Sequence, residues 1–165
     1  MFTAHLHLLS NHVPLLGFFF GGLILFYGLI RKNAGIMSGG YLALVFAGIG
    51  GIIAYFTGEP AEDAVKGIAG VATRAIGEHE EAAGFAIFCI GIVALLSVQG
   101  FIWALKENKN LKKFTIVVLI LVLIGIGIIS RTAYLGGKIR HTEFYTNTGA
   151  MKPANVENQE GEDKD

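Results

Sequence analysis

Apolar residues gather in four long blocks along the chain, and polar or charged residues fill the intervals between them. Each block falls within the roughly 17–25 residues that an α-helix needs to cross the hydrocarbon of a bilayer. None of the four blocks has a charged residue in its interior. The pattern therefore predicts an all-α fold, an integral membrane four-helix bundle. The predicted spans are residues 13–30, 35–57, 82–105 and 114–130.

Features inside the predicted spans indicate how the helices begin and pack. Asn11 is placed to cap the first span, and Pro14 then falls in its first turn, where proline is tolerated. Small residues recur four apart, a spacing that lets helix backbones approach closely in a membrane. These pairs are Gly17 with Gly21, Gly35 with Gly39, and Ala47 with Gly51. We expect the polar residues within or beside the blocks to serve helix contacts; they are Ser38, Ser97, Gln99 and Thr115.

The interval between the second and third blocks has a helical pattern of its own. Apolar residues repeat there at helical spacing, namely Ala61, Ala64, Val65, Ile68, Val71, Ala72, Ala75 and Ile76. Charged residues such as Glu62, Lys66 and Arg74 occupy the opposite face. This predicts an amphipathic helix on the outer surface of the bundle. The end of the chain differs, because residues 146–165 are polar and lack an apolar period, which predicts a disordered tail after a membrane domain of residues 1–145.

The charged residues predict an orientation. The short connections at 31–34 and 106–113 carry six Lys or Arg and one acidic residue, whereas residues 58–81 carry two basic and six acidic residues. By the positive-inside rule, both termini and the middle connection lie outside. We expect a multi-pass protein of a bacterial cytoplasmic (inner) membrane, with both termini periplasmic. The whole chain has 13 basic and 13 acidic residues, which gives no basis for nucleic-acid binding.

The five histidines all fall outside the predicted spans. In the predicted topology they share the outer face, although they come from three separate segments; they are His5, His7, His12, His79 and His141. Histidine is the commonest metal ligand, and helix bundles build metal and cofactor sites from facing helices. We therefore take His7, His12, His79 and His141 as candidate ligands. Scattered surface histidines without a ligand are the alternative.

Two kinds of cofactor suit such a cluster. Haem b takes axial histidines and needs cations for its propionates, which Arg74 or Arg140 would supply. A zinc or copper site needs three or four ligands from histidine and carboxylate. Around the ligands, Glu78 and Glu143 would orient the imidazoles, and His5 is a further neighbour. The single cysteine, Cys89, excludes an intramolecular disulfide framework and a Cys-x-x-Cys redox pair.

Four short motifs, in order, resemble a bacterial membrane family known as domain of unknown function 2231. The first is residues 7–14 (HLLSNHVP), with two histidines five apart and a proline two residues after the second. The others are residues 55–62 (YFTGEPAE), His79 before the third span, and residues 136–141 (GGKIRH) after the fourth. The resemblance spans residues 3–144. One departure is Val13, where the family usually has an aromatic residue.

The resemblance implies a four-helix membrane bundle with redox work at its outer face. Relatives in that family include chains fused to Rieske or cytochrome c-like modules, and its site residues correspond to His7, His12 and His79. We expect an electron carrier or subunit rather than an independent enzyme, with a separate redox protein or a larger membrane complex as partner. Two alternatives stay open: a zinc or copper protein without redox turnover, and a structural subunit without a cofactor.

Overall fold

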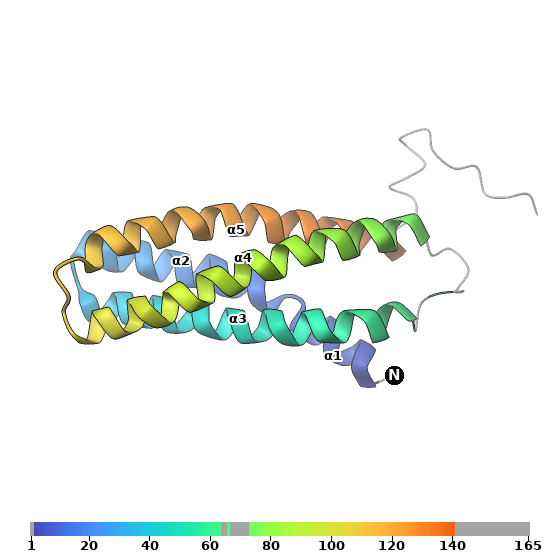
Figure 1. Cartoon of the computed structure of the whole chain (residues 1–165), viewed down its shortest axis with the longest axis horizontal. Helices are drawn as coiled ribbons and strands as arrows, with labels where there is room; N and C mark the ends of the chain where they lie inside the picture. The colour runs from blue at the N-terminus through green and yellow to red at the C-terminus, as the bar shows by residue number, and fades with distance from the viewer. Residues whose placement is uncertain (1, 64–65, 67–72, 141–165) are drawn as a thin grey trace, which may run out of the picture.

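The computed structural model describes residues 2–63, 66 and 73–140, and all of its regular elements are helices (Figure 1). They are α1 (Phe2–Ser10), α2 (Val13–Arg31), α3 (Ala34–Asp63), α4 (Thr73–Leu105) and α5 (Leu111–Arg140). Four helical stretches are long and apolar enough to cross a membrane, one of them formed by α1 and α2 together. The predicted all-α bundle with four spans is therefore confirmed.

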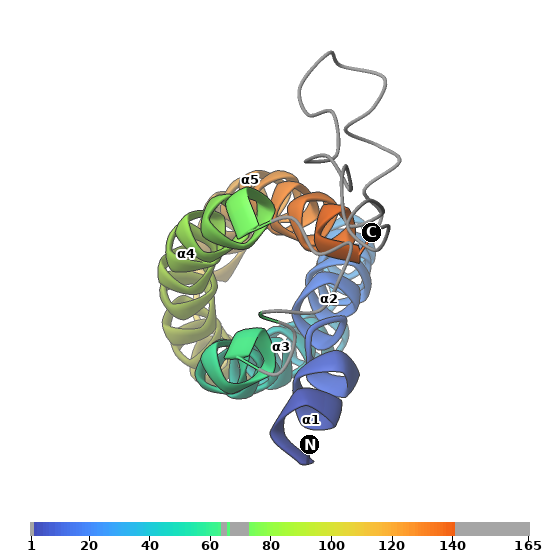
Figure 2. The ribbon, with the colours of Figure 1, turned by 90° about the vertical axis from the view of Figure 1, so that its right-hand side faces the viewer.

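The four long helices form a closed ring in the order α2, α3, α4, α5, with neighbours antiparallel (Figure 2). Both short connections, at residues 32–33 and 106–110, lie at one end of the bundle, which we call the connector end. The other end, which we call the histidine end, holds α1, the last turns of α3 and α5, and the first turns of α4. Helix α1 lies outside the ring and packs on α3.

The outward faces of the helices are apolar. Large side chains such as Phe26, Phe88 and Leu123 are more than half exposed. A water-soluble protein rarely exposes so much contiguous apolar surface, whereas lipid tails solvate it well. On α5, Phe114 and Tyr134 lie 20 residues apart, about 30 Å along a helix and so about the thickness of the hydrocarbon layer. We therefore describe the chain as a multi-pass membrane protein.

The helices at the histidine end extend beyond the predicted spans. Helix α3 continues past Thr57 to Asp63, and α4 begins nine residues before Ala82, at Thr73. The ends of the predicted amphipathic helix belong to these two extensions, and Ala75 in α4 is fully buried. The intervening apolar positions, Ala64, Val65, Ile68, Val71 and Ala72, lie outside the described residues, as does the predicted tail at 146–165.

Helix α1 was not predicted, and the structure also corrects the expected cap. Asn11 does not cap α2, because His12 occupies the N-cap position and makes no side-chain capping hydrogen bond. Instead the chain continues from α1 through one turn, in which the Asn11 N–H donates to the His7 carbonyl at 2.9 Å. Pro14 does fall in the first turn of α2, as predicted.

Glycines allow the closest helix contacts. A Cβ atom added at Gly17 would lie 2.5 Å from Ala47 Cβ, and one at Gly21 would lie 2.9 Å from Leu44 Cγ. The prediction that small residues let helix backbones approach closely is therefore confirmed for Gly17, Gly21 and Ala47. Gly35 and Gly39 are not in such close contacts: a Cβ at Gly35 would lie 3.3 Å from Asn33 Oδ1, and one at Gly39 would lie 4.0 Å from Ile24 Cγ2. Gly28 and Gly40 take their place, against Met37 and Leu25 respectively.

The two short connections, at residues 32–33 and 106–110, have the same backbone conformation where the preceding helix ends. Lys32 follows the end of α2 and Glu107 lies just after α4, and each has a left-handed φ, of 51° and 48° respectively. In both cases the next residue, Asn33 or Asn108, donates its N–H to the carbonyl five residues earlier, at 3.0 Å. This pattern is the Schellman motif, in which glycine is the usual left-handed residue. The two turns fix the antiparallel pairing of α2 with α3 and of α4 with α5.

Candidate cofactor site at the histidine end

His7 connects α1 to α3. Its Nδ1 lies 2.9 Å from the carbonyl oxygen of Ala54, with the Thr57 hydroxyl 3.5 Å away. A carbonyl oxygen can only accept, so the hydrogen of the neutral ring is on Nδ1. The imidazole also lies against Gly58, where an added Cβ would be 3.6 Å from His7 Cε1. This contact is one reason why the short helix α1 stays on the surface of α3.

His79 makes the corresponding connection between α4 and α5. Its Nδ1 donates to the Thr132 carbonyl at 2.9 Å, and the Thr132 hydroxyl lies 3.2 Å from the Ala82 carbonyl. The ring is half-buried over Gly136, where a Cβ would lie 3.0 Å from His79 Cε1. Glycine at this position therefore leaves the room that the imidazole occupies.

The two imidazoles lie at the same end of the bundle. His7 and Glu62 both lie close enough to His79 to affect it electrostatically. Within the described residues, the hydrogen bonds recorded for both rings use Nδ1. Because Nδ1 carries the hydrogen in each ring, the Nε2 lone pair of each ring is left for a ligand.

Besides the two histidines, this end holds a polar side chain, Asn11, whose carbonyl oxygen lacks a partner in the described part of the chain. The Oδ1 atom of Asn11 is buried and accepts no hydrogen bond within the described part of the chain. Asn11 lies four residues after His7, on the same side of the α1 turn. Buried polar atoms are nearly always hydrogen-bonded, and an unpartnered one favours a nearby group that would donate to it.

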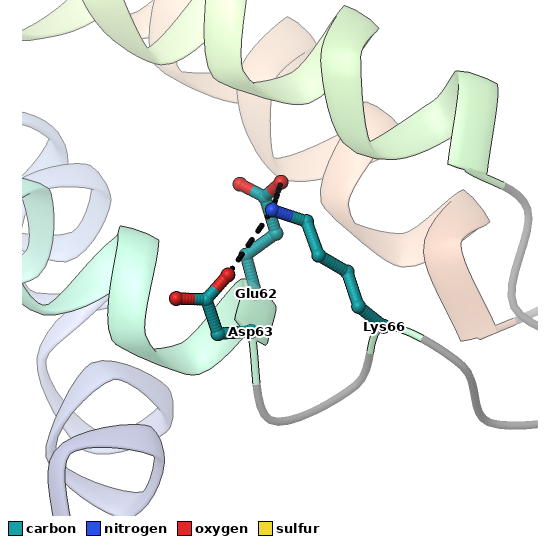
Figure 3. Close-up of polar contacts among 3 residues, drawn as sticks. All are labelled: Glu62, Asp63 and Lys66. Atoms are coloured by element: carbon teal, nitrogen blue, oxygen red, sulfur yellow. Dashed lines mark hydrogen bonds and ion pairs between the residues drawn. The ribbon is translucent and has the colours of Figure 1, made fainter.

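Glu62 sits at the rim of this end, held by a basic neighbour (Figure 3). The Lys66 Nζ lies 2.9 Å from Glu62 Oε1 and 3.1 Å from Asp63 Oδ1. These two carboxylates raise the pKa of Lys66, the Glu62 contribution being the larger. The positive charge of Lys66 also offsets the unfavourable placement of the Glu62 and Asp63 carboxylates at the negative end of the α3 dipole.

The remaining predicted site residues are not brought to this pair. His5 and His12 are exposed, and Arg74 forms a 2.9 Å ion pair with Glu78 rather than facing an imidazole. Within residues 2–63, 66 and 73–140, no three His, Cys, Asp or Glu side chains form a group that could hold a metal ion. His141, Glu143 and the Arg140 side chain lie outside the described residues.

Sequence reasoning missed the groups that orient the two imidazoles. The acceptors are main-chain carbonyls, of Ala54 and Thr132, which carry no sequence signal at all. Gly136 belongs to the Gly-Gly pair of the motif at 136–141. The sequence therefore singled out this glycine, but it did not indicate that the glycine makes room for the His79 ring. Thr57 was the predicted end of a span, and its hydroxyl near His7 depends on how α1 folds back.

Comparison with known proteins finds no family model, no curated protein and no solved structure that matches this chain. The resemblance to domain of unknown function 2231 stays a prediction.

Proposed function

We propose that this protein is a small membrane electron carrier, in which His7 and His79 bind haem b at the histidine end. One observation carries the proposal: each ring donates its Nδ1 hydrogen to a main-chain carbonyl. Histidines that ligate metals usually donate their other ring N–H in this way, because it fixes the tautomer and the ring orientation.

The donor set fits haem better than a closed metal site. A haem b that takes two histidines, here His7 and His79, would supply a one-electron redox couple tuned by its ligands and burial. Two histidines match that requirement, whereas a structural zinc site needs four ligands. Within the described residues the pair has no third donor that would complete such a group.

The chain's own residues hold this arrangement from two sides of the bundle. Ala54 and Thr132 lie in long helices, so their carbonyls are fixed relative to each other by the packing of α3, α4 and α5. Gly136 leaves space for the His79 ring, and Thr132 itself is held by hydroxyl bonds to Ile128 and Ala82. His7 and His79 are both half-buried as residues.

The test is the visible spectrum of the protein purified in detergent, oxidised and dithionite-reduced, together with elemental analysis. We expect a Soret band with sharp α and β bands on reduction. His7→Ala and His79→Ala should abolish these bands, while His5→Ala and His12→Ala, which alter exposed histidines, should leave them unchanged. Circular dichroism of each variant shows whether the helices are retained.

Three outcomes would overturn the proposal. Stoichiometric zinc or copper without a Soret band would indicate a metal-binding protein instead. Wild-type protein that takes up neither haemin nor metal would favour a structural subunit, in which the two imidazoles only tie helices together. Full haem content in both the His7→Ala and His79→Ala variants would place the ligands elsewhere.

We also propose that the histidine end faces the periplasm of a bacterium, where a separate redox protein or a larger membrane complex would exchange electrons with it. The basic connections support this orientation through the positive-inside rule. In a Cys89→Ser background, a membrane-impermeant maleimide should label Lys138→Cys but not Lys109→Cys in intact cells. The reverse labelling would contradict the orientation.

A further inference from the structure

The connector end carries a dense group of basic residues with almost no acid. Its six cationic side chains are all exposed, and Glu107 is the acidic residue among them. They are Arg31, Lys32, Lys106, Lys109, Lys112 and Lys113, which we call the basic cluster. The ion pairs that the structure records in the described residues lie at the histidine end, on Lys66 and Arg74. The basic cluster is therefore not neutralised by recorded ion pairs within the chain.

Two of the six residues of the basic cluster are placed where a helix dipole opposes their charge. Arg31 is in the last turn of α2, where the negative end of the dipole favours a cation. Lys112 and Lys113 are in the first turn of α5, where no acidic residue offsets the positive end. This placement leaves the charges of the two lysines uncompensated by their own helix, which favours an anion from outside the chain.

Aromatic side chains place the basic cluster at the level of lipid headgroups. Trp103 packs on Phe114 with ring centroids 4.9 Å apart, and Tyr27 is exposed one turn before Arg31. Tryptophan and tyrosine concentrate at the boundary between hydrocarbon and water. The lysines lie within about two turns of these rings, so their ammonium groups reach the phosphate layer.

We propose that the connector end binds the anionic headgroups of phospholipids in the adjacent leaflet. The chemistry is that of several ammonium groups facing a layer of phosphates, with attraction that grows with the number of lysines. It does not depend on the cofactor proposed for the opposite end. An acidic soluble protein is the other class of partner that a basic surface attracts, and the experiment below separates the two.

The experiment compares thermal unfolding in nanodiscs of phosphatidylcholine alone and in nanodiscs with a third of phosphatidylglycerol. We expect the anionic lipid to raise the unfolding temperature of the wild type. The triple variant Lys109→Gln/Lys112→Gln/Lys113→Gln should lose that increase. A matched control with three charges removed at the other end, Lys66→Gln/Arg131→Gln/Lys138→Gln, should keep it. At 1 M salt, where the screening length is about 3 Å, the increase should shrink.

Several results would overturn the proposal. One is an unfolding temperature of the wild type that does not respond to phosphatidylglycerol. Another is a triple variant that responds as fully as the control variant. An equal increase from inorganic phosphate in pure phosphatidylcholine would assign the lysines to free phosphate. Saturable binding of polyglutamate, without any response to phosphatidylglycerol, would assign them to an acidic protein.

Discussion

The Tyr41 and His79 rings occupy similar positions in the bundle, but they differ in whether all their polar atoms are hydrogen-bonded. Tyr41 in α3 lies over Gly100 of α4, and its hydroxyl is 2.8 Å from the Thr115 hydroxyl of α5. His79 in α4 lies over Gly136 of α5, and its Nδ1 is 2.9 Å from the Thr132 carbonyl. In each layer, a glycine makes room for a ring that hydrogen-bonds to a threonine of α5.

The two rings differ in how deeply they are buried and in how many of their polar atoms are hydrogen-bonded. Tyr41 is fully buried, and Thr115 also donates to the Leu111 carbonyl at 2.9 Å, so both hydroxyls are satisfied within the chain. His79 is half-buried, and within the described residues its recorded hydrogen bond uses one nitrogen of two. A ring with all its polar atoms satisfied acts as a structural tie. A ring that is hydrogen-bonded only through Nδ1, so that the Nε2 lone pair can bind a ligand, has the features of a binding site.

Crowding the Tyr41 layer should give the largest change in stability. A Cβ at Gly100 would overlap the Tyr41 ring, which has buried neighbours on every side. We expect Gly100→Ala to lower the free energy of unfolding in detergent by about 2 kcal/mol. The control is Gly91→Ala in the same helix, where nothing lies within 4 Å of the added Cβ. That variant should be neutral or stabilised by up to about 1 kcal/mol. Equal effects of the two substitutions would contradict the described packing.

Crowding the His79 layer should affect binding more than stability. A Cβ at Gly136 would lie 3.0 Å from His79 Cε1 and 3.2 Å from Nδ1, so the half-buried ring must shift by a few tenths of an ångström. We expect Gly136→Ala to lower the cofactor affinity by about 10–100-fold, as disturbed orienting partners do. Haemin titration measures this affinity. Gly137→Ala, with open space around its Cβ, is the matched control and should bind as the wild type does.

Removing the Tyr41 hydroxyl should have a moderate effect. Tyr41→Phe deletes one buried hydrogen bond and leaves Thr115 bonded to Leu111, so we expect a loss of about 1 kcal/mol of unfolding free energy. Chemical unfolding in detergent micelles gives the measurement. Tyr27→Phe, at an exposed position of α2, should change it by less. If the two variants lose the same amount, the Tyr41–Thr115 bond does not stabilise the bundle.

The smallest expected change is a gain at the connector end, far from both rings. Glu107 has a φ of 48°, which favours glycine. Glu107→Gly should raise the free energy of unfolding by up to about 1 kcal/mol, because it removes the steric cost of a left-handed side chain. Glu107→Gln changes the charge without relieving the backbone, so it separates the two effects. A gain of the same size in Glu107→Gln would show that charge, and not φ, is responsible.

Much of the fold could be predicted from the sequence because the signals are local. The four spans follow from uninterrupted apolar runs, and small residues at helical spacing indicate close helix contacts, as the structure shows for Gly17 against Ala47. Thr115 was expected to serve a helix contact, and it bonds to Tyr41. Ser97 is also buried as a contact residue would be, although its hydroxyl has no partner within the described residues.

The candidate site was predicted only in part. The sequence grouped the histidines at one end, and His7 and His79 do lie there. It did not separate these two from His5 and His12, because exposure depends on how α1 packs on α3. Helix α1 was missed for the same reason: it has nine residues, too few to be stable alone, and only the contacts with α3 fix it.

The spans, the basic connections and the end of the bundle that carries His7 and His79 follow from the amino-acid sequence alone. These properties depend on the order of apolar and polar residues along the chain, which is local information. Which histidines have an acceptor for Nδ1 depends on helix packing, because Ala54 lies 47 positions from His7 and Thr132 lies 53 positions from His79. Helix packing brings such distant groups together, and main-chain carbonyls, which are the same in every residue, leave no trace in the sequence.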